Sequence, residues 1–289
     1  MMILKNPAAE IYIPDGAPVE KALPRTTHLA IGAHQDDIEI MAVDGILKCY
    51  QKPAAWFAGA VVTNGSGSPR SGLYAGTTDE EMQKIRVVEQ KRAAFLGDYG
   101  AQVFLGYPSV DVKDPDNRTI IEDIKTLVSA TSPKVIYTHN LADKHATHVG
   151  LAVKVIQALR ELPVEQRPDK VYGCEVWRDL DWMMDVEKVV FDVSALENLQ
   201  MALVGVFDSQ VSGGKRYDLA AMGRRMANAT FFASHSTNEA ERLLFGMDLL
   251  PLVQDNSLEI KDYVLDFIHR FAADVSTMIE NVSQKREIE

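Results

Sequence analysis

Two short segments of this 289-residue chain concentrate side chains that can bind a metal. Residues 33–39 read Ala-His-Gln-Asp-Asp-Ile-Glu, and residues 138–148 read Thr-His-Asn-Leu-Ala-Asp-Lys-His-Ala-Thr-His. Together the two segments hold four of the seven histidines. Each segment directly follows an apolar run typical of a buried strand. Two such clusters at matching places in the fold point to one metal site more strongly than either would alone.

The spacing within the clusters suits hydrolysis of an amide. His34 and Asp37 are three residues apart, so a turn into a helix can aim both at one point, and His145 and His148 share one face of a helical turn. Two imidazoles and one carboxylate leave a position for water on a divalent metal, which lowers the pKa of that water to about 7 and polarises a carbonyl oxygen. Asp36 can then serve as general base. The remaining histidine can stabilise the oxyanion or protonate the leaving amine.

These segments resemble the PIG-L / LmbE-like family of metal-dependent deacetylases. Residues 33–37 are similar to its Ala-His-Pro-Asp-Asp signature, and Asp143-x-His145-x-x-His148 is similar to its second signature. The similarity extends through Val62-Thr63-Asn64-Gly65, Arg86-x-x-Glu89, Leu105-Gly106-Tyr107-Pro108 and Ser209-Gln210. The resemblance therefore covers approximately residues 27–210.

The resemblance implies a Rossmann-like fold and removal of the acetyl group from N-acetylglucosamine-type sugars or their conjugates. By position it implies His34, Asp37 and His148 as metal ligands. Asp36 is then the general base, and His145 is the histidine that assists the transition state. The implied metal is zinc, with ferrous iron as the alternative.

Other residues are candidates for supporting roles. Arg86 matches a family arginine near the sugar, and Arg70 and Asp111 are candidate substrate contacts. Asp143 can orient a metal-bound histidine or cap the following helix, and we favour the first interpretation. His139 fits support of the ligands and a plain structural role equally well.

The chain departs from the family pattern at three places. Gln35 replaces the usual proline, Ala146-Thr147 replaces the common Pro-Asp, and Ser109 stands where an acidic residue often follows Tyr-Pro. None of these changes removes an implied ligand. They bear on substrate identity, because several of them are candidates to line the sugar pocket.

The elements that must position these residues alternate between strands and helices. The predicted strands cover residues 27–33, 56–63, 101–105, 134–138 and 170–177, and the predicted helices cover 37–51, 78–96, 117–130 and 145–162. Thr78 and Glu81 predict a capping box at the start of the second helix. This alternation predicts an α/β fold with a mostly parallel sheet flanked by helices. In such sheets ligands bind beyond the carboxyl ends of the strands, where both clusters fall.

The chain is predicted to comprise three parts. Residues 1–24 form an irregular arm, 25–210 a catalytic domain, and 211–289 a mostly helical extension packed on that domain. Helices are predicted near 194–207, 214–230 and 257–281. The last helix carries Val264, Ile268, Phe271, Val275 and Met278 at alternating spacings of four and three. This amphipathic stripe suits packing on the core or on another subunit, which allows a homo-oligomer.

Composition excludes several classes of protein. With 30 basic and 41 acidic residues the net charge is −11, which disfavours nucleic-acid binding. We find no run of apolar residues long enough for a membrane span and no apparent secretory leader. The two cysteines, Cys49 and Cys174, fit a reducing compartment. A cytoplasmic enzyme acting on a small amino-sugar substrate is therefore expected.

Two alternatives stay open at this point. Two histidines and one carboxylate also describe non-haem Fe(II) oxygenases, although the alternation of strands and helices argues against an all-β fold. A non-catalytic relative that binds a sugar or a partner is the other alternative, and the intact ligand set argues against it.

Overall fold

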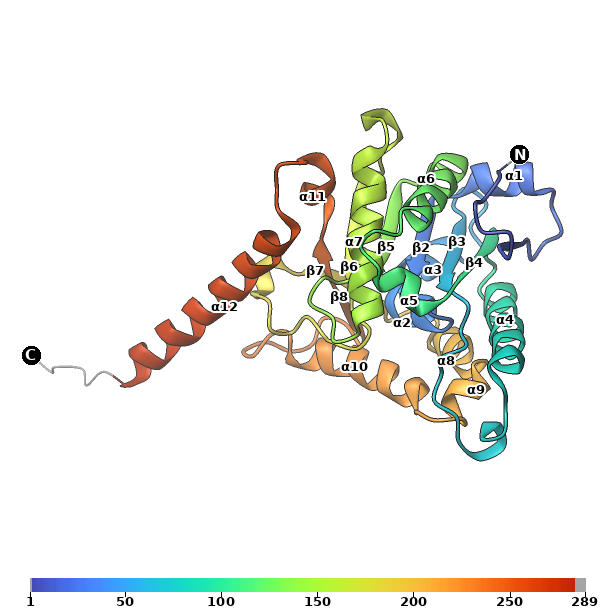
Figure 1. The fold of residues 1–289 in the computed structure, drawn as a ribbon. Helices are drawn as coiled ribbons and strands as arrows, with labels where there is room; N and C mark the ends of the chain where they lie inside the picture. Colours follow the sequence, from blue (N-terminus) through green and yellow to red (C-terminus); the bar gives the residue numbers. More distant parts are fainter. Residues whose placement is uncertain (1, 284–289) are drawn as a thin grey trace, which may run out of the picture.

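A mixed sheet of eight strands runs through residues 2–283, the part of the chain that this computed structural model describes (Figure 1). Its order is β1-β4-β3-β2-β5-β6-β8-β7. The strands are β1 (Glu10–Tyr12), β2 (His28–Gly32), β3 (Phe57–Thr63), β4 (Ala101–Tyr107), β5 (Val135–His139), β6 (Lys170–Cys174), β7 (Val189–Asp192) and β8 (Leu243–Asp248). The five strands from β4 to β6 are parallel, whereas β1 pairs antiparallel with β4 and β8 pairs antiparallel with both β6 and β7. The predicted α/β fold with a mostly parallel sheet is confirmed.

Helices cover both faces of the sheet. They are α1 (Val19–Ala22), α2 (Asp37–Met41), α3 (Val43–Cys49), α4 (Asp79–Leu96), α5 (Ser109–Lys113), α6 (Thr119–Thr131), α7 (Ala146–Glu161), α8 (Glu197–Gly205), α9 (Asp208–Val211), α10 (Tyr217–Phe231), α11 (Leu250–Gln254) and α12 (Ile260–Ser283). Successive residues of β2 point to opposite faces: Leu29 and Ile31 belong to the core shared with α6 and α7, and Ala30 to the core shared with α3, α4 and α8. The central strands are thus buried on both sides.

The direction of the chain across the sheet reverses between β2 and β5. From β2 the chain passes to β3 and β4 on one side, and then returns to β5 and β6 on the other. In doubly wound folds a ligand crevice opens at this switch point, outside the carboxyl ends of the two strands. The two polar clusters follow β2 and β5, so this topology brings them together.

Helix α2 depends on a buried arginine from α10. The predicted helix 37–51 is divided into α2 and α3 at Ala42, where φ is −114° and ψ is 21°. The end of α2 therefore leaves backbone carbonyls without partners inside the helix. The guanidinium of Arg225, which is 1% exposed, donates to the carbonyls of Glu39 and Ile40 at 2.9 and 3.1 Å and to Gln200 at 2.9 Å.

Three strands lie outside the predicted set. The strand β1 falls in the arm predicted to be irregular, and β7 and β8 extend the opposite edge of the sheet, with β8 inside the extension predicted to be mostly helical. All three pair antiparallel at or near an edge, so they lie outside the alternation of strand and helix that identified the parallel strands. The capping box of Thr78 and Glu81 is present as predicted. The division into arm, catalytic domain and extension stays a prediction.

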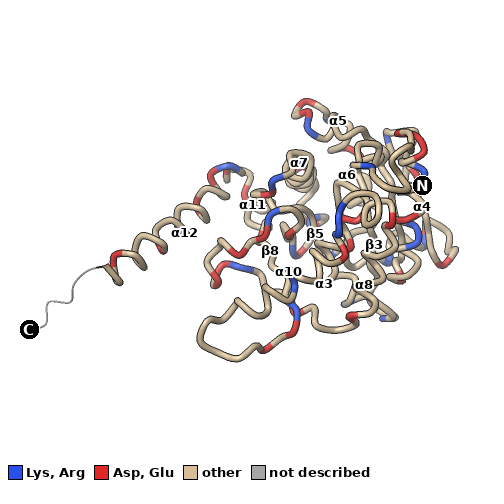
Figure 2. The backbone as a smooth tube through the Cα atoms, turned by 90° about the horizontal axis from the view of Figure 1, so that it is seen from below, with Lys and Arg blue, Asp and Glu red and all other residues tan. Residues whose placement is uncertain are grey.

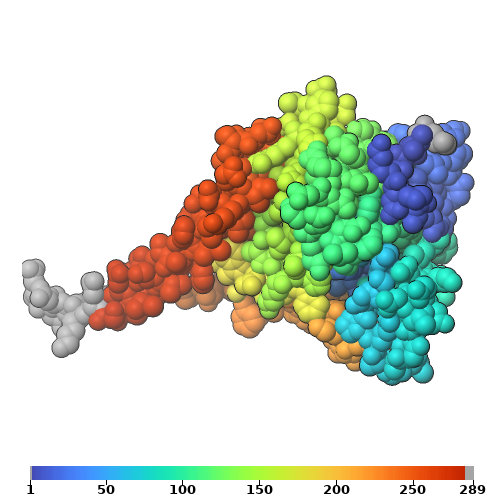
Figure 3. Space-filling view, in the orientation of Figure 1, coloured from blue at the N-terminus to red at the C-terminus, as the bar shows by residue number. Residues whose placement is uncertain are grey.

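The helix α12 extends away from the rest of the molecule (Figures 1 and 3). Val264 packs against the core near its start, and Met278 and Val282 near its end are 60% and 77% exposed. Figure 2 shows basic and acidic residues interspersed along the chain, α12 included. Among the described helices, none is both long and apolar enough to cross a membrane.

We expect Arg225→Met to lower the free energy of unfolding by about 3 kcal/mol, because two buried carbonyls lose their donors. Urea denaturation measures the change. Arg118→Met, at a 56% exposed side chain on the surface, should change it by less than about 0.5 kcal/mol. Equal effects of the two variants would show that Arg225 does not secure α2.

Candidate active site

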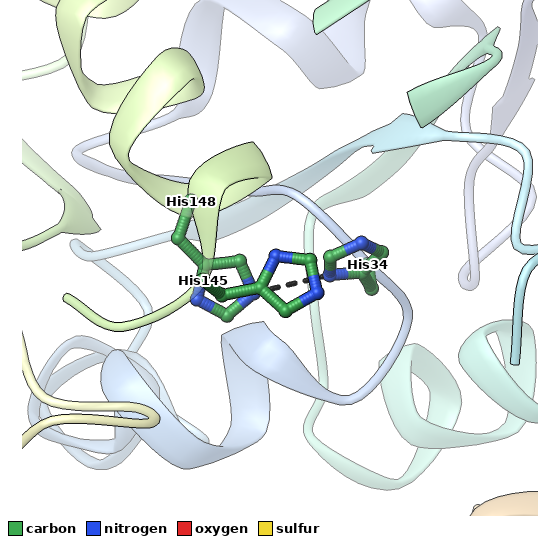
Figure 4. Close-up of side chains that lie close together, drawn as sticks. All are labelled: His34, His145 and His148. Carbon is green, nitrogen blue, oxygen red and sulfur yellow. Dashed lines mark hydrogen bonds between the residues drawn. The ribbon is translucent and has the colours of Figure 1, made fainter. Parts of the chain in front are cut away.

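Three donor atoms from the two clusters converge at the carboxyl ends of β2 and β5. His34 Nδ1 lies 3.1 Å from His148 Nε2 and 3.2 Å from Asp37 Oδ2, and His148 Nε2 lies 3.4 Å from the same Asp37 oxygen. His34 and His148 are 114 positions apart in the sequence. Figure 4 shows His34, from the turn after β2, facing His145 and His148 at the start of α7.

A carboxylate behind His148 fixes the orientation of its ring. Asp143 Oδ2 lies 3.4 Å from His148 Nδ1 and accepts the backbone N–H of Trp177 at 3.1 Å, while its Oδ1 accepts the N–H of His145 at 3.0 Å. Because a carboxylate only accepts, His148 carries its proton on Nδ1, and the lone pair of Nε2 faces His34 and Asp37. This arrangement of carboxylate and histidine is typical of metal sites.

The charges at this point suit a bound cation. Burial opposes ionisation of Asp37, but His148 and His139 outweigh it and hold the pKa of this carboxyl well below its usual value. Burial lowers the pKa of both His34 and His148, so their imidazoles are neutral at pH 7. One negative charge and two free lone pairs are the donor set of a mononuclear zinc site.

His139 lies next to these atoms and has a different role. Its ring stacks on that of His148 with centroids 3.8 Å apart, and its Nε2 lies 3.4 Å from Asp37 Oδ2. That Nε2 accepts the backbone N–H of Ala33 at 2.9 Å, so its lone pair is already in use. The set His34, Asp37 and His148 therefore fits a metal better than the set Asp37, His139 and His148. Tetrahedral zinc with bonds of about 2.0 Å separates its ligand atoms by about 3.3 Å, close to the spacing of the first set.

Asp36 occupies a strained turn beside the candidate ligands. Its φ of +91° lies in the left-handed region, which costs a non-glycine residue about 1–3 kcal/mol and is often found at functional sites. Burial raises the pKa of its carboxyl well above the usual value, Arg86 at 3.6 Å opposes this, and Asp37 adds to it. The carboxyl of Asp36 lines the same cavity as His34 and Asp37.

His145 presents one defined nitrogen to the cavity. Its Nδ1 accepts the backbone N–H of Thr147 at 3.3 Å, so the proton of the neutral ring lies on Nε2. Burial, together with the neighbouring His148 and His34, lowers the pKa of His145 to about 4. The ring packs against His34 and His148, with centroids 4.9 and 4.6 Å away.

The predicted substrate residues divide into two groups. Arg86 lines the cavity and donates to the backbone carbonyl of Gln35 and to the hydroxyl of Ser68. Arg70 does not line it, because its guanidinium binds the loop carbonyls of Ser66 and Thr77 and the carboxylate of Asp79. Asp111 does not line it either: the same helix, α5, contributes Ser109 and Lys113 instead.

The cavity holds residues that the sequence analysis did not single out as site residues. It has a volume of about 450 Å³, and its walls include Ser68, Lys113, Trp177, Lys215 and Tyr217. Gln210, which lies within a segment that carried the family resemblance, also lines it. Trp177 and Tyr217 come from segments after the second cluster, where no motif marks them. Only the folding of α10 against the end of β6 brings them to the site.

Two departures from the family pattern have different consequences here. The Gln35 side chain points away from the cavity and donates to the carbonyl of Thr63 at 3.3 Å. It packs against Gly65, whose φ is +79° and where a Cβ would lie 2.6 Å from the Gln35 oxygen. Thr147, in contrast, lines the cavity directly.

Comparison with known families agrees with this geometry. The model of the PIG-L family, described as GlcNAc-PI de-N-acetylase, matches residues 29–159. This segment belongs to the PIG-L family. The match includes both clusters and confirms the predicted membership in a family of hydrolytic N-deacetylases. Among curated proteins, none matches the chain by sequence.

Solved structures share the fold of this chain at low sequence identity. The N,N'-diacetylchitobiose deacetylase of Pyrococcus horikoshii is 16% identical, with 76% of this chain and 83% of that chain covered and a TM-score of 0.57. The deacetylase of the A40926 pseudoaglycone is 16% identical, with 78% and 97% covered and a TM-score of 0.54. A 4-carboxy-2-hydroxymuconate hydratase of Pseudomonas putida is 12% identical, with 78% and 96% covered and a TM-score of 0.58. Because a hydratase shares the fold, the fold alone does not define the reaction.

The ligand set of His34, Asp37 and His148 and the set of Asp37, His139 and His148 make opposite predictions for the histidines. We expect His148→Ala to reduce bound zinc far below one ion per chain, because Nε2 faces the other two donors. His139→Gln should keep the ion, because the Nε2 of His139 is already bonded to Ala33. Elemental analysis of the folded variants, with folding checked by circular dichroism, measures this. Loss of zinc from His139→Gln with retention in His34→Ala would favour the other set.

Proposed function

We propose that this protein is a zinc-dependent hydrolase that removes the N-acetyl group from an N-acetylglucosamine-type sugar or its conjugate. The observation that supports this most is the convergence of His34, Asp37 and His148 beside Asp36 and His145 in one cavity. These five residues lie in the segment that matches the PIG-L family. Ferrous iron is the alternative metal for the same ligands.

A divalent cation held by His34, Asp37 and His148 would polarise the amide carbonyl and acidify a bound water. Asp36, on the same turn as two of these residues, takes the proton from the attacking water as general base. His145 turns its Nε2–H toward the cavity, because Nδ1 is held by the backbone of Thr147. This N–H donates a hydrogen bond to the developing oxyanion, and the proton that Asp36 took from water passes to the leaving amine.

The walls of the cavity suit a sugar. Its volume of about 450 Å³ falls in the range of small-ligand sites. Ser68, Lys113 and Gln210 offer polar groups to hydroxyls, and Trp177 offers an aromatic face. Arg86 fixes the Gln35 carbonyl and the Ser68 hydroxyl, so it shapes the loop that covers one side of the sugar.

We expect Asp36→Asn to lower kcat for acetate release from N-acetylglucosaminides by at least about 100-fold, because the amide cannot accept the proton of water. Zinc content should stay at the wild-type level, since Asp36 is not a proposed ligand. Acetate release and elemental analysis on the same samples measure both quantities.

The wild-type protein provides the control for this proposal. It should release acetate from at least one member of a panel of N-acetylated amino sugars when loaded with zinc or ferrous iron. No acetate from the panel under either loading would contradict the deacetylase. Addition of water to an unsaturated acid by the same samples would point to a hydratase instead. Oxygen consumption with Fe(II) and 2-oxoglutarate would point to an oxygenase.

We also propose that two copies of the chain associate through α12. Val264, Ile268, Phe271, Val275, Met278 and Val282 follow the spacing 4, 3, 4, 3, 4, which is the heptad repeat of helices that pair with other helices. Every second one of them (Ile268, Val275 and Val282) is β-branched. Met278 and Val282 of this stripe and the neighbouring Ile279 are 60%, 77% and 58% exposed, so pairing would remove a continuous apolar surface from water.

We also propose a cytoplasmic location. Cys49 and Cys174 are buried and form no disulfide, which fits a reducing compartment.

We expect the wild-type protein to be a dimer in light scattering after gel filtration and Val275→Asp/Met278→Asp to be a monomer, because two carboxylates would be buried in the seam. The matched control is Ser276→Asp/Thr277→Asp, which places the same charges beside the seam and should remain a dimer. A wild-type monomer at high micromolar concentration, or a dimeric Val275→Asp/Met278→Asp variant, would contradict this pairing.

A further inference from the structure

A second cavity adjoins the site and has a different chemical character. It has a volume of about 290 Å³ and shares Ile40, Val176, Trp177, Lys215 and Tyr217 with the catalytic cavity. Ile40 lies on α2 three residues after Asp37, so the second cavity begins one helical turn from a proposed metal ligand. We call this second cavity the annex.

The first turns of α10 form one wall of the annex. Tyr217, Ala220, Ala221 and Arg224 recur at the spacing of one helical face and all line it. The two alanines at the centre of this face leave the space that larger side chains would fill. Leu244 of β8 closes another side.

The polar groups around the annex already have partners within the protein. Glu175 accepts from the backbone N–H groups of Leu180 and Phe245 and from the side chain of Asn228. The guanidinium of Arg225 serves the carbonyls at the end of α2.

The remaining charged groups of the annex are engaged as well. The Arg224 guanidinium donates to the carbonyls of Val176 and Trp177, and Arg216 pairs with Asp218. The ammonium of Lys215 lies over the Trp177 ring, 4.0 Å from its centroid, at the boundary between the two cavities. What the annex offers to a ligand is therefore mainly apolar surface.

We propose that the annex binds an apolar group attached to the N-acetylated sugar, such as an aryl or short alkyl aglycone, while the sugar occupies the catalytic cavity. This inference rests on the function proposed above and names the class of conjugate. The volume of the annex, about 290 Å³, equals the liquid volume of about ten water molecules, at about 30 Å³ each, which suits one aromatic ring or a short chain. An apolar group that enters it gains burial without displacing any hydrogen bond of the walls.

The turnover test compares two substrates that differ only in the aglycone. The wild-type enzyme should deacetylate phenyl N-acetyl-β-glucosaminide with a kcat/KM about tenfold or more above that of the methyl glycoside. Ala221→Phe, which fills the annex, should bring the ratio of the two values close to one. The matched control Ala202→Phe, at an exposed alanine of α8, should keep the wild-type ratio. An equal ratio in the wild type and in Ala221→Phe would overturn the proposal that the annex binds the aglycone.

A binding test that needs no turnover separates the two proposals. In crystals soaked with 4-bromophenyl N-acetyl-β-glucosaminide, the anomalous signal of bromine should lie between Ala221 and Leu244. Bromine in the annex without acetate release by any sample would support the proposed aglycone site and contradict the proposed deacetylase activity. Acetate release with bromine outside the annex would support the deacetylase activity and overturn the proposed aglycone site. The result stays decisive even where Ala221→Phe fails to fold.

Discussion

One oxygen of the buried Asp37 carboxylate connects the two halves of the candidate active site. Asp37 Oδ2 accepts the backbone N–H of His34 at 2.6 Å, which shapes the turn after β2, and it lies within 3.4 Å of ring nitrogens of His34, His139 and His148. A buried negative charge is costly unless it is paired and hydrogen-bonded. The backbone N–H of His34 donates to this oxygen, whereas the Nε2 atoms of His139 and His148 carry no proton to donate. A cation at the same point would satisfy this requirement most fully, which links the stability of the turn to metal binding.

The parts predicted from sequence are those that local patterns determine. The central parallel strands have long apolar runs, and the residues of both clusters follow directly on β2 and β5, so their convergence follows from topology. The antiparallel strands β1, β7 and β8 lie outside the alternation of strand and helix that identified the parallel strands. Arg70 and Asp111 illustrate a second limit, because proximity in sequence to a motif does not determine whether a side chain points into the cavity. The aromatic walls, Trp177 and Tyr217, depend on how α10 packs, and no local signal encodes that packing.

Because the fold is shared, the specificity for one reaction must come from the walls of the cavity. A hydratase and deacetylases have the same arrangement of strands, so a sheet with a polar crevice at its switch point supports more than one reaction of water. What distinguishes them must be the groups around the reacting atoms. In this chain the proposed contributors are Asp36, held in a left-handed turn, and His145, held in one tautomer by Thr147. Both are fixed by backbone geometry rather than by flexible contacts, which is what a preorganised site requires.

Helix α10 contributes both to the walls of the cavity and to the position of α2. In its first turns Tyr217 lines both cavities and Ala221 lines the annex. One turn after Ala221, Arg225 donates to the carbonyls at the end of α2. Since α2 begins with Asp37, a shift of α10 would move a wall of the substrate cavity and disturb a proposed metal ligand at once. Helix α10, which lies outside the family match, therefore contributes directly to the site. In relatives with the same two signatures, a different helix at this place would be expected to change the aglycone that is accepted while leaving the ligands in position.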